Sequence, residues 1–402
     1  MALITIEEPR RKLPAKGFAL FELGFRPFFL AAALFAVLFM GVWLATLQGL
    51  LQAPAGLYPS AWHGHEMIFG YALAVIAGFL LTAVQNWTSL PMPKHGKLAA
   101  LFALWLGGRL LPYVPGLPYA AIAAVDMVFL PVLVVTVARP VLKVKQVRNY
   151  VFPVLLLGML TSNAMFHAGM LGQDPELALT GLNLALYLIV LIIVVMGGRV
   201  IPYFTERRVN STTRKRPLIE WLAPITVVAV LAAWFVSTQS SIGNLLLVPL
   251  AGAAAIVHAL RLAGWQDRRL WQVPLLWVLH LGYGWIAIGF GLDALAAANL
   301  ISRFPAMHAY AAGAIGVLTL GMMSRVALGH TGRSLETAKT IPWAFGLINL
   351  AAAVRVLGPL LMPHSTAAML QLGGVLWMAA FAVFATVYAP MLWHPRVDGK
   401  PG

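Results

Sequence analysis

The sequence predicts an all-α, polytopic membrane protein with twelve transmembrane helices, and three observations lead to this. Of the 402 residues, 60% are hydrophobic and only 10% are charged, whereas a soluble domain has about 25% charged residues. Apolar runs long enough to cross a bilayer alternate with short loops rich in Pro, Gly and charge. The basic residues gather in every second loop. Strands of a membrane barrel would be shorter and would alternate in hydropathy, so helices are expected.

The apolar runs divide almost the whole chain. We expect residues 1–27 to form a cytoplasmic N-terminal tail, because they lack the apolar region and cleavage site of a signal peptide. Residues 28–389 then form a single transmembrane domain, and residues 390–402 form a cytoplasmic C-terminal tail. The twelve predicted spans are 28–50, 62–87, 97–113, 119–138, 150–171, 178–201, 218–236, 243–263, 272–295, 306–327, 341–361 and 367–389.

The distribution of Lys and Arg fixes the predicted orientation. With the N-terminus inside, 25 of the 28 basic residues fall on the inner side, and only Arg109, Arg303 and Arg355 lie outside. This asymmetry follows the positive-inside rule and places both termini in the cytoplasm. The net charge of +15 therefore reflects membrane orientation, and no nucleic-acid partner is expected.

Three spans share a spacing that predicts an internal repeat. Span 62–87 contains His65, Gly70 and Gly78, and span 306–327 contains His308, Gly313 and Gly321 at the same intervals. Span 178–201 joins them at its inner end, where MGGRV aligns with MMSRV of span 306–327. The spans are four helices apart, so the chain is expected to hold three repeats of four helices. The simpler alternative is that the small residues only line helix contacts.

The histidines are the candidate ligands for a cofactor, because the sequence has no cysteine. His63, His65, His167 and His308 all lie near the outer face on three spans. We expect His65 and His308 to be the axial pair of a haem, with His63 and His167 as copper ligands. Glu66 is the candidate group that orients a metal-ligating histidine or, as a catalytic residue, accepts a proton. His63 and His65 diverge by roughly 200° on a helix, so they face different partners.

Further polar residues lie inside or at the ends of apolar spans. His280 is deep in span 272–295 and needs a partner, which Tyr283 or a metal would supply. Asp126 is expected to be paired or to line a polar path. Arg109 and Arg355 are at the right depth for haem propionates, although snorkelling to the interface is the simpler interpretation. Each histidine at a helix end also has a simpler interpretation, as an interfacial polar residue, and for His280 the alternative is a satisfied core histidine.

Several strings resemble one known family. They are FRPFF at 25–29, WHGHEM at 62–67, GFLLTAVQNW at 78–87, MGGRVIP at 196–202 and GMMSRVALGHTGR at 321–333. Together they are similar to the NnrS family, haem- and copper-containing membrane proteins of the nitric oxide response, over essentially the whole chain. The resemblance implies a bacterial inner-membrane protein with haem b and copper that protects against nitrosative stress. It implies neither the reaction nor the ligands.

A second likeness is to the catalytic subunit of haem–copper oxidases and nitric oxide reductases. That subunit also has three groups of four helices, with histidines on its second and tenth spans. Here Leu182 takes the position in span 178–201 that matches His65 and His308, and the next span has no histidine pair. The departure argues against an oxidase-type binuclear centre.

Two functions stay open on the sequence alone. One is a protein that binds nitric oxide or turns it over as an oxidoreductase, within the lipid bilayer into which the gas partitions. The other is a transporter or metal-homeostasis permease that captures an ion at the outer histidines. No quinone or cytochrome docking motif is legible, so the electron donor stays unassigned.

Overall fold

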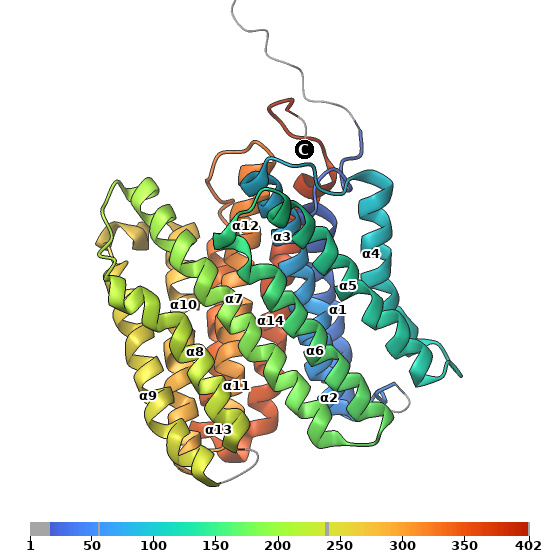
Figure 1. The fold of residues 1–402 in the computed structure, drawn as a ribbon, viewed down its shortest axis with the longest axis vertical. Helices are drawn as coiled ribbons and strands as arrows, with labels where there is room; N and C mark the ends of the chain where they lie inside the picture. The colour runs from blue at the N-terminus through green and yellow to red at the C-terminus, as the bar shows by residue number, and fades with distance from the viewer. Residues whose placement is uncertain (1–16, 55–56, 238–240, 401–402) are drawn as a thin grey trace, which may run out of the picture.

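Twelve continuous helices run side by side in the computed structural model, which describes residues 17–54, 57–237 and 241–400 (Figure 1). The described residues contain no strand. Each predicted span corresponds to one of the twelve helices. Eleven of them are long and apolar enough to cross a membrane, and α4 is shorter, with 16 residues. The chain is therefore a multi-pass membrane protein, as predicted.

The helices keep close to the predicted boundaries. The two that contain π-helical turns are α2–η1–α3 and α11–η5–α12, and the longest is α7, which ends at Val209 and not at 201. The bounds are α1 Phe25–Leu47, α2 Pro59–His65, η1 Glu66–Ala72, α3 Leu73–Thr88, α4 His95–Leu110, α5 Tyr119–Lys143, α6 Val151–Leu171, α7 Pro175–Val209, α8 Pro217–Ser237, α9 Ser241–Gly264, α10 Pro274–Ala297, α11 Phe304–His308, η5 Ala309–Gly316, α12 Val317–His330, α13 Ile341–Leu361 and α14 Thr366–Trp393.

The spans with the shared spacing meet inside the bundle. α7 contacts α2, η1 and η5, and Leu182 packs so closely on Gly64 that a side chain there would lie 3.0 Å from it. A π-helix follows directly after His65 and again after His308. Because π-helical turns are rare, their recurrence at matching positions supports a repeat relation between these two helices. α7 is α-helical throughout.

The two chain ends are tied together at one end of the bundle. The Ala19 N–H donates to the Trp393 carbonyl at 2.7 Å. Arg26 is fully buried and donates to the carbonyls of Leu392 at 2.9 Å and His394 at 2.7 Å. These carbonyls at the C-terminal end of α14 have no partner within the helix, so Arg26 caps it.

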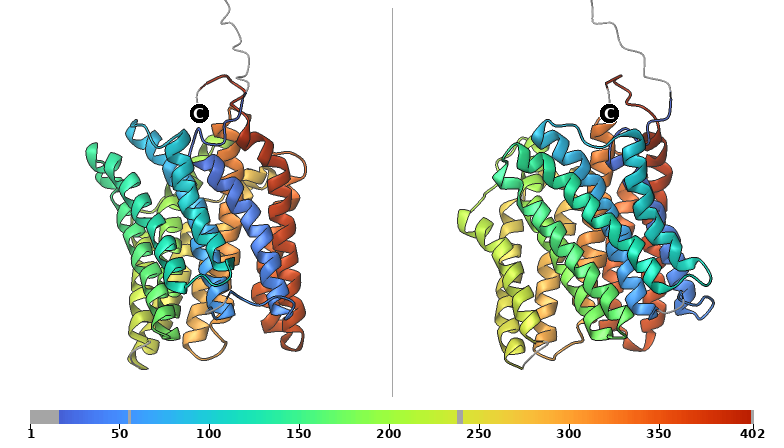
Figure 2. Two further views of the ribbon diagram at one scale, coloured as in Figure 1. Left: turned by 90° about the vertical axis from the view of Figure 1, so that its right-hand side faces the viewer. Right: turned by 45° about the vertical axis from the view of Figure 1, so that its right-hand side comes forward.

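The FRPFF string thus joins the first helix to the last, and the HTGR string completes the joint. The Val397 N–H donates to the Thr331 carbonyl at 3.2 Å, and Arg396 donates to the His330 carbonyl at 3.0 Å. Figure 2 shows the described chain ends together at one end of the helices, whereas α2 and α13 reach the opposite end (Figure 1).

We expect Arg26→Gln to lower stability, because the α14 carbonyls would lose a charged donor in a buried place. The expected loss is about 2–4 kcal/mol. Thermal unfolding of the purified protein in detergent measures it. Lys97→Gln, an exposed change at the start of α4, is the control and should leave the midpoint unchanged. Equal midpoints for the two variants would contradict the capping role.

Candidate functional site

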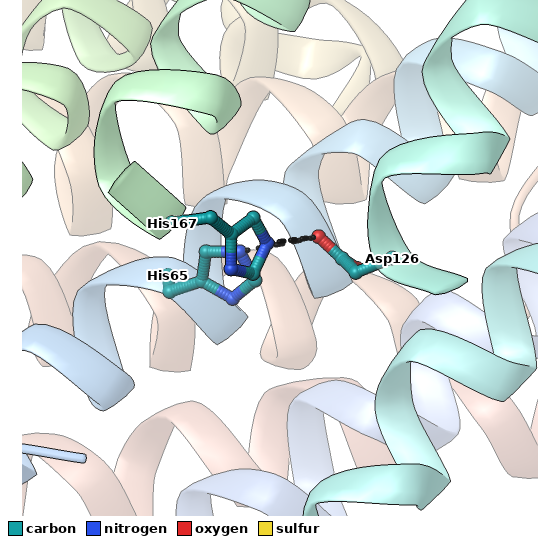
Figure 3. A group of neighbouring side chains, drawn as sticks. All are labelled: His65, Asp126 and His167. Carbon is teal, nitrogen blue, oxygen red and sulfur yellow. Dashed lines mark hydrogen bonds and ion pairs between the residues drawn. The ribbon is translucent and has the colours of Figure 1, made fainter. Parts of the chain in front are cut away.

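A buried cluster of His65, Asp126 and His167 joins three helices near the end of the bundle opposite the termini (Figure 3). His65 ends α2, Asp126 lies in α5 and His167 lies in the last turns of α6. Each exposes at most 7% of its surface. One ligand atom from each residue lies within 4.8 Å of the others. The three side chains are therefore spaced so that they could hold one metal ion.

Arg109 sets the orientation of the acidic groups in this cluster. Its guanidinium donates to Glu66 Oε1 at 2.6 Å and to Asp126 Oδ1. Gly108 leaves the space for this contact, because a Cβ there would collide with the Asp126 carboxylate. With Oδ1 held by Arg109, the other oxygen of Asp126 faces the histidines. Asp126 is thus paired, as predicted, and Arg109 is committed to two carboxylates.

The surroundings of His65 favour a bound cation. Its Nδ1 lies 3.2 Å from Glu66 Oε1, and its Nε2 lies 3.0 Å from Asn163 Oδ1 and 3.4 Å from Asp126 Oδ2. Both ring nitrogens face acceptors, but a neutral imidazole has only one N–H. The two carboxylates also outnumber Arg109 by one negative charge. A cation between Nε2 and these oxygens would satisfy both the lone pairs and the charge.

His167 contributes an imidazole that is already oriented. Its Nε2 lies 3.0 Å from Asp126 Oδ2, and its Nδ1 lies 2.8 Å from the Tyr119 hydroxyl. A second hydrogen bond of this kind fixes the ring and the tautomer of a metal-ligating histidine. The available donors are two imidazole nitrogens, a carboxylate oxygen and an amide oxygen. This set suits copper, zinc or iron better than magnesium or calcium.

A second site is an apolar cavity of about 270 Å³ on the other side of α2. Its wall includes residues of α1, α2, α7, η5, α11, α13 and α14. The lining is rich in methionine and tryptophan, namely Met40, Met67, Met307, Trp43 and Trp377. Its cationic or titratable residues are His63, His308 and Arg355. The cavity therefore combines a large apolar surface with a few polar groups, as cofactor sites do.

The polar groups of the cavity have unused hydrogen-bonding atoms. His308 Nδ1 donates to the Phe304 carbonyl at 2.9 Å, which leaves the lone pair on Nε2. That Nε2 accepts from Arg355 at 3.0 Å, while the other terminal nitrogen of Arg355, Nη1, is buried and has no partner among the described residues. His63 stacks on Trp43, with ring centres 4.3 Å apart, and its buried Nδ1 also has no partner in the described part of the chain.

The structure sorts the four outer histidines into two pairs. His63 and His308 line the cavity, and His65 and His167 belong to the cluster. The predicted divergence of His63 and His65 is the reason, because each faces a different side of α2. Sequence reasoning paired His65 with His308 and His63 with His167; the structure brings together neither of those pairs in one site.

Of the other predicted site residues, Glu66 and Arg355 lie at the two sites and His280 does not. Glu66 lies in the first turn of η1 beside the cluster, and Arg355 lines the cavity. His280 is in neither place: its Nδ1 donates to the Leu276 carbonyl at 2.9 Å. Tyr283, its predicted partner, instead bonds to His258 and Arg261. His280 is thus a core histidine that the backbone satisfies.

Sequence reasoning missed two residues that contact the cluster. Asn163 donates to Asp126 Oδ2 at 2.8 Å and faces His65, and Tyr119 holds His167. The signal for Asn163 is its place one helical turn before His167 in an apolar helix, where both side chains share a face. Tyr119 begins α5 and carries no comparable signal.

We expect Arg109→Gln to destabilise the protein by about 3–5 kcal/mol, because it leaves two buried carboxylates without their cation. Thermal unfolding in detergent measures the loss. Arg139→Gln removes the same charge from an exposed position on α5 and should have no such effect. Adding Glu66→Gln to Arg109→Gln should recover part of the stability. A double variant as unstable as the two single losses combined would contradict the bridge.

Residues 19–396 match the family described as NnrS protein, which is nearly the whole chain. No curated protein matches the sequence. The resemblance stated from the sequence strings is thereby confirmed over all twelve helices. This chain belongs to the NnrS family.

Proposed function

We propose that this protein holds haem b and copper in two adjacent sites near the periplasmic face and handles nitric oxide there. The observation that carries the proposal is the arrangement around α2. One face of this helix presents His63 to a cavity that also contains His308, and the other presents His65 to a metal-type cluster. Family membership supports a role in the nitric oxide response.

The cavity fits a haem by its chemistry. His63 and His308 are the residues that would hold the haem iron, and this replaces the pairing of His65 with His308. The Nδ1–H of His308 is already bound to a carbonyl, so Nε2 is the atom available to iron. Arg355 would turn from His308 to a propionate through its unpaired donor. Bound haem supplies an iron at which nitric oxide can bind.

The cluster fits copper by its donors. His65, His167 and Asp126 would be the ligands, with Asn163 and Tyr119 holding them in place. Imidazole nitrogens suit copper. Glu66 lies against both His65 and Arg109, so it would accept a proton next to the metal, and it is our candidate catalytic group.

The location follows from charge and from the substrate. The excess of Lys and Arg at the end that holds both termini favours a bacterial inner membrane with that end in the cytoplasm. Both sites then lie near the periplasmic face. Nitric oxide is apolar and dissolves in lipid, so it can reach the cavity from within the bilayer.

The haem assignment predicts a spectrum. Purified protein should show a Soret band that shifts on addition of nitric oxide. We expect His63→Ala and His308→Ala to lose or shift this band, because each removes a nitrogen that would hold the iron, and His280→Gln to keep it. Absorbance and haem content measure this. A colourless protein that moves an ion across vesicles would overturn the proposal in favour of a permease.

The copper assignment predicts metal content. We expect His167→Ala and Asp126→Asn to lose about one copper per chain, and Tyr119→Phe to weaken binding about 10-fold through the hydrogen bond to His167. Elemental analysis and copper titration measure this. His364→Ala removes an exposed histidine and is the control. Full copper content in both ligand variants would exclude the cluster as the site.

A further inference from the structure

Arg325 differs from the other buried arginines at the end of the bundle that holds the termini. It exposes only 9% of its surface, and its guanidinium lies 3.5 Å from the centre of the Phe204 ring. In the part of the chain that the structure describes, no carboxylate pairs with it and no hydrogen bond reaches it. By contrast, Arg261 binds Glu220, the Val194 carbonyl and Tyr283. Stacking on a ring leaves the guanidinium donors of Arg325 unused.

The surroundings of Arg325 are positive. Arg208 follows Phe204 by one helical turn on α7, so it repels Arg325, and Arg207 stacks on Tyr203 in the same segment. The acid of this segment, Glu206, already accepts from Thr213 and pairs with Lys215 at 3.4 Å. Two neighbouring cations repel each other, and an anion from outside the chain would relieve this repulsion.

The depth of this place indicates where the anion comes from. Exposed aromatic side chains mark a membrane–water interface, where their apolar rings and polar tips are both satisfied. At this end of the bundle such residues are Tyr203, Trp271 and Trp343, which expose 50%, 49% and 76% of their surface. Tyr203 lies directly beside Phe204 on α7. Arg325 therefore lies at the level of the lipid headgroups.

We propose that Arg325 and Arg208 bind the phosphate of an anionic phospholipid in the inner leaflet. Arg325 would supply a pair of donors at the edge of its planar guanidinium, which matches a phosphate, and Phe204, stacked on one face, would hold the guanidinium in place. Arg208, which is exposed, would add attraction. The proposal is independent of haem, copper and nitric oxide, because the site is at the opposite end of the bundle from the outer histidines.

The test measures lipid binding to the purified full-length protein. Titration with phosphatidylglycerol in detergent, followed by native mass spectrometry, should show a tightly held lipid that phosphatidylcholine does not replace. We expect Arg325→Gln and Arg208→Gln each to weaken this binding about fivefold, since each basic residue near an anionic membrane surface strengthens binding by about that factor. Arg216→Gln removes an exposed charge from the same end and is the matched control.

Two further variants make the result decisive if Arg325→Gln folds poorly. Arg325→Lys keeps the charge but loses the paired donors, and Phe204→Leu keeps both arginines but loses the ring; each should weaken binding. Competition by inorganic phosphate at millimolar concentration would identify a soluble anion as the ligand and overturn the lipid. Equal affinity in Arg216→Gln and Arg325→Gln, or equal affinity for both lipids, would overturn the site.

Discussion

The ionic bridge from Arg109 to Glu66 and Asp126 is the interaction on which the candidate metal centre depends. A carboxylate among apolar helices costs several kcal/mol unless a cation lies beside it. Arg109 lies beside two of them, on η1 and α5, and so joins α2–η1–α3, α4 and α5 at one level. Because Arg109 holds Oδ1 of Asp126, the other carboxylate oxygen, Oδ2, faces the histidines. The one negative charge left over gives the cluster its attraction for a cation.

The π-helical turns place this chemistry on the helices. A π-helical turn inserts an extra residue and rotates the residues that precede it relative to those that follow. Both turns begin directly after a histidine. The side chains of His65 and His308 are therefore rotated relative to the α-helical residues that follow the turn. The two helices differ in their chemistry: after His65 comes Glu66, which binds Arg109, whereas His308 itself accepts from Arg355. In both cases the donor is an arginine of the next helix, Arg109 of α4 or Arg355 of α13.

The sequence predicted the helix number and a layer of histidines at the end of the bundle opposite the termini, because hydropathy and the asymmetry of Lys and Arg depend only on composition along the chain. It also predicted that His63 and His65 diverge, from helical geometry. It could not predict which partner each faces, since that depends on how α2 is rotated against α6 and α11. Tyr119 begins a helix with no periodic signal, and the π-helical turns break the 3.6-residue period on which such reasoning depends. His280 looked like a ligand because sequence alone does not show that carbonyls of Leu276 and Trp265 surround it.

The contact between Arg26 and the end of α14 has a consequence for how the protein is made. α1 leaves the ribosome first and α14 last, yet the carbonyls that accept from Arg26 belong to residues 391–394. During synthesis Arg26 therefore stays hydrated in the headgroup region until α14 has been inserted. Only then can α1 pack against α14, so a chain truncated before α14 lacks this contact and keeps the packing of α1 on α3, η1 and α12.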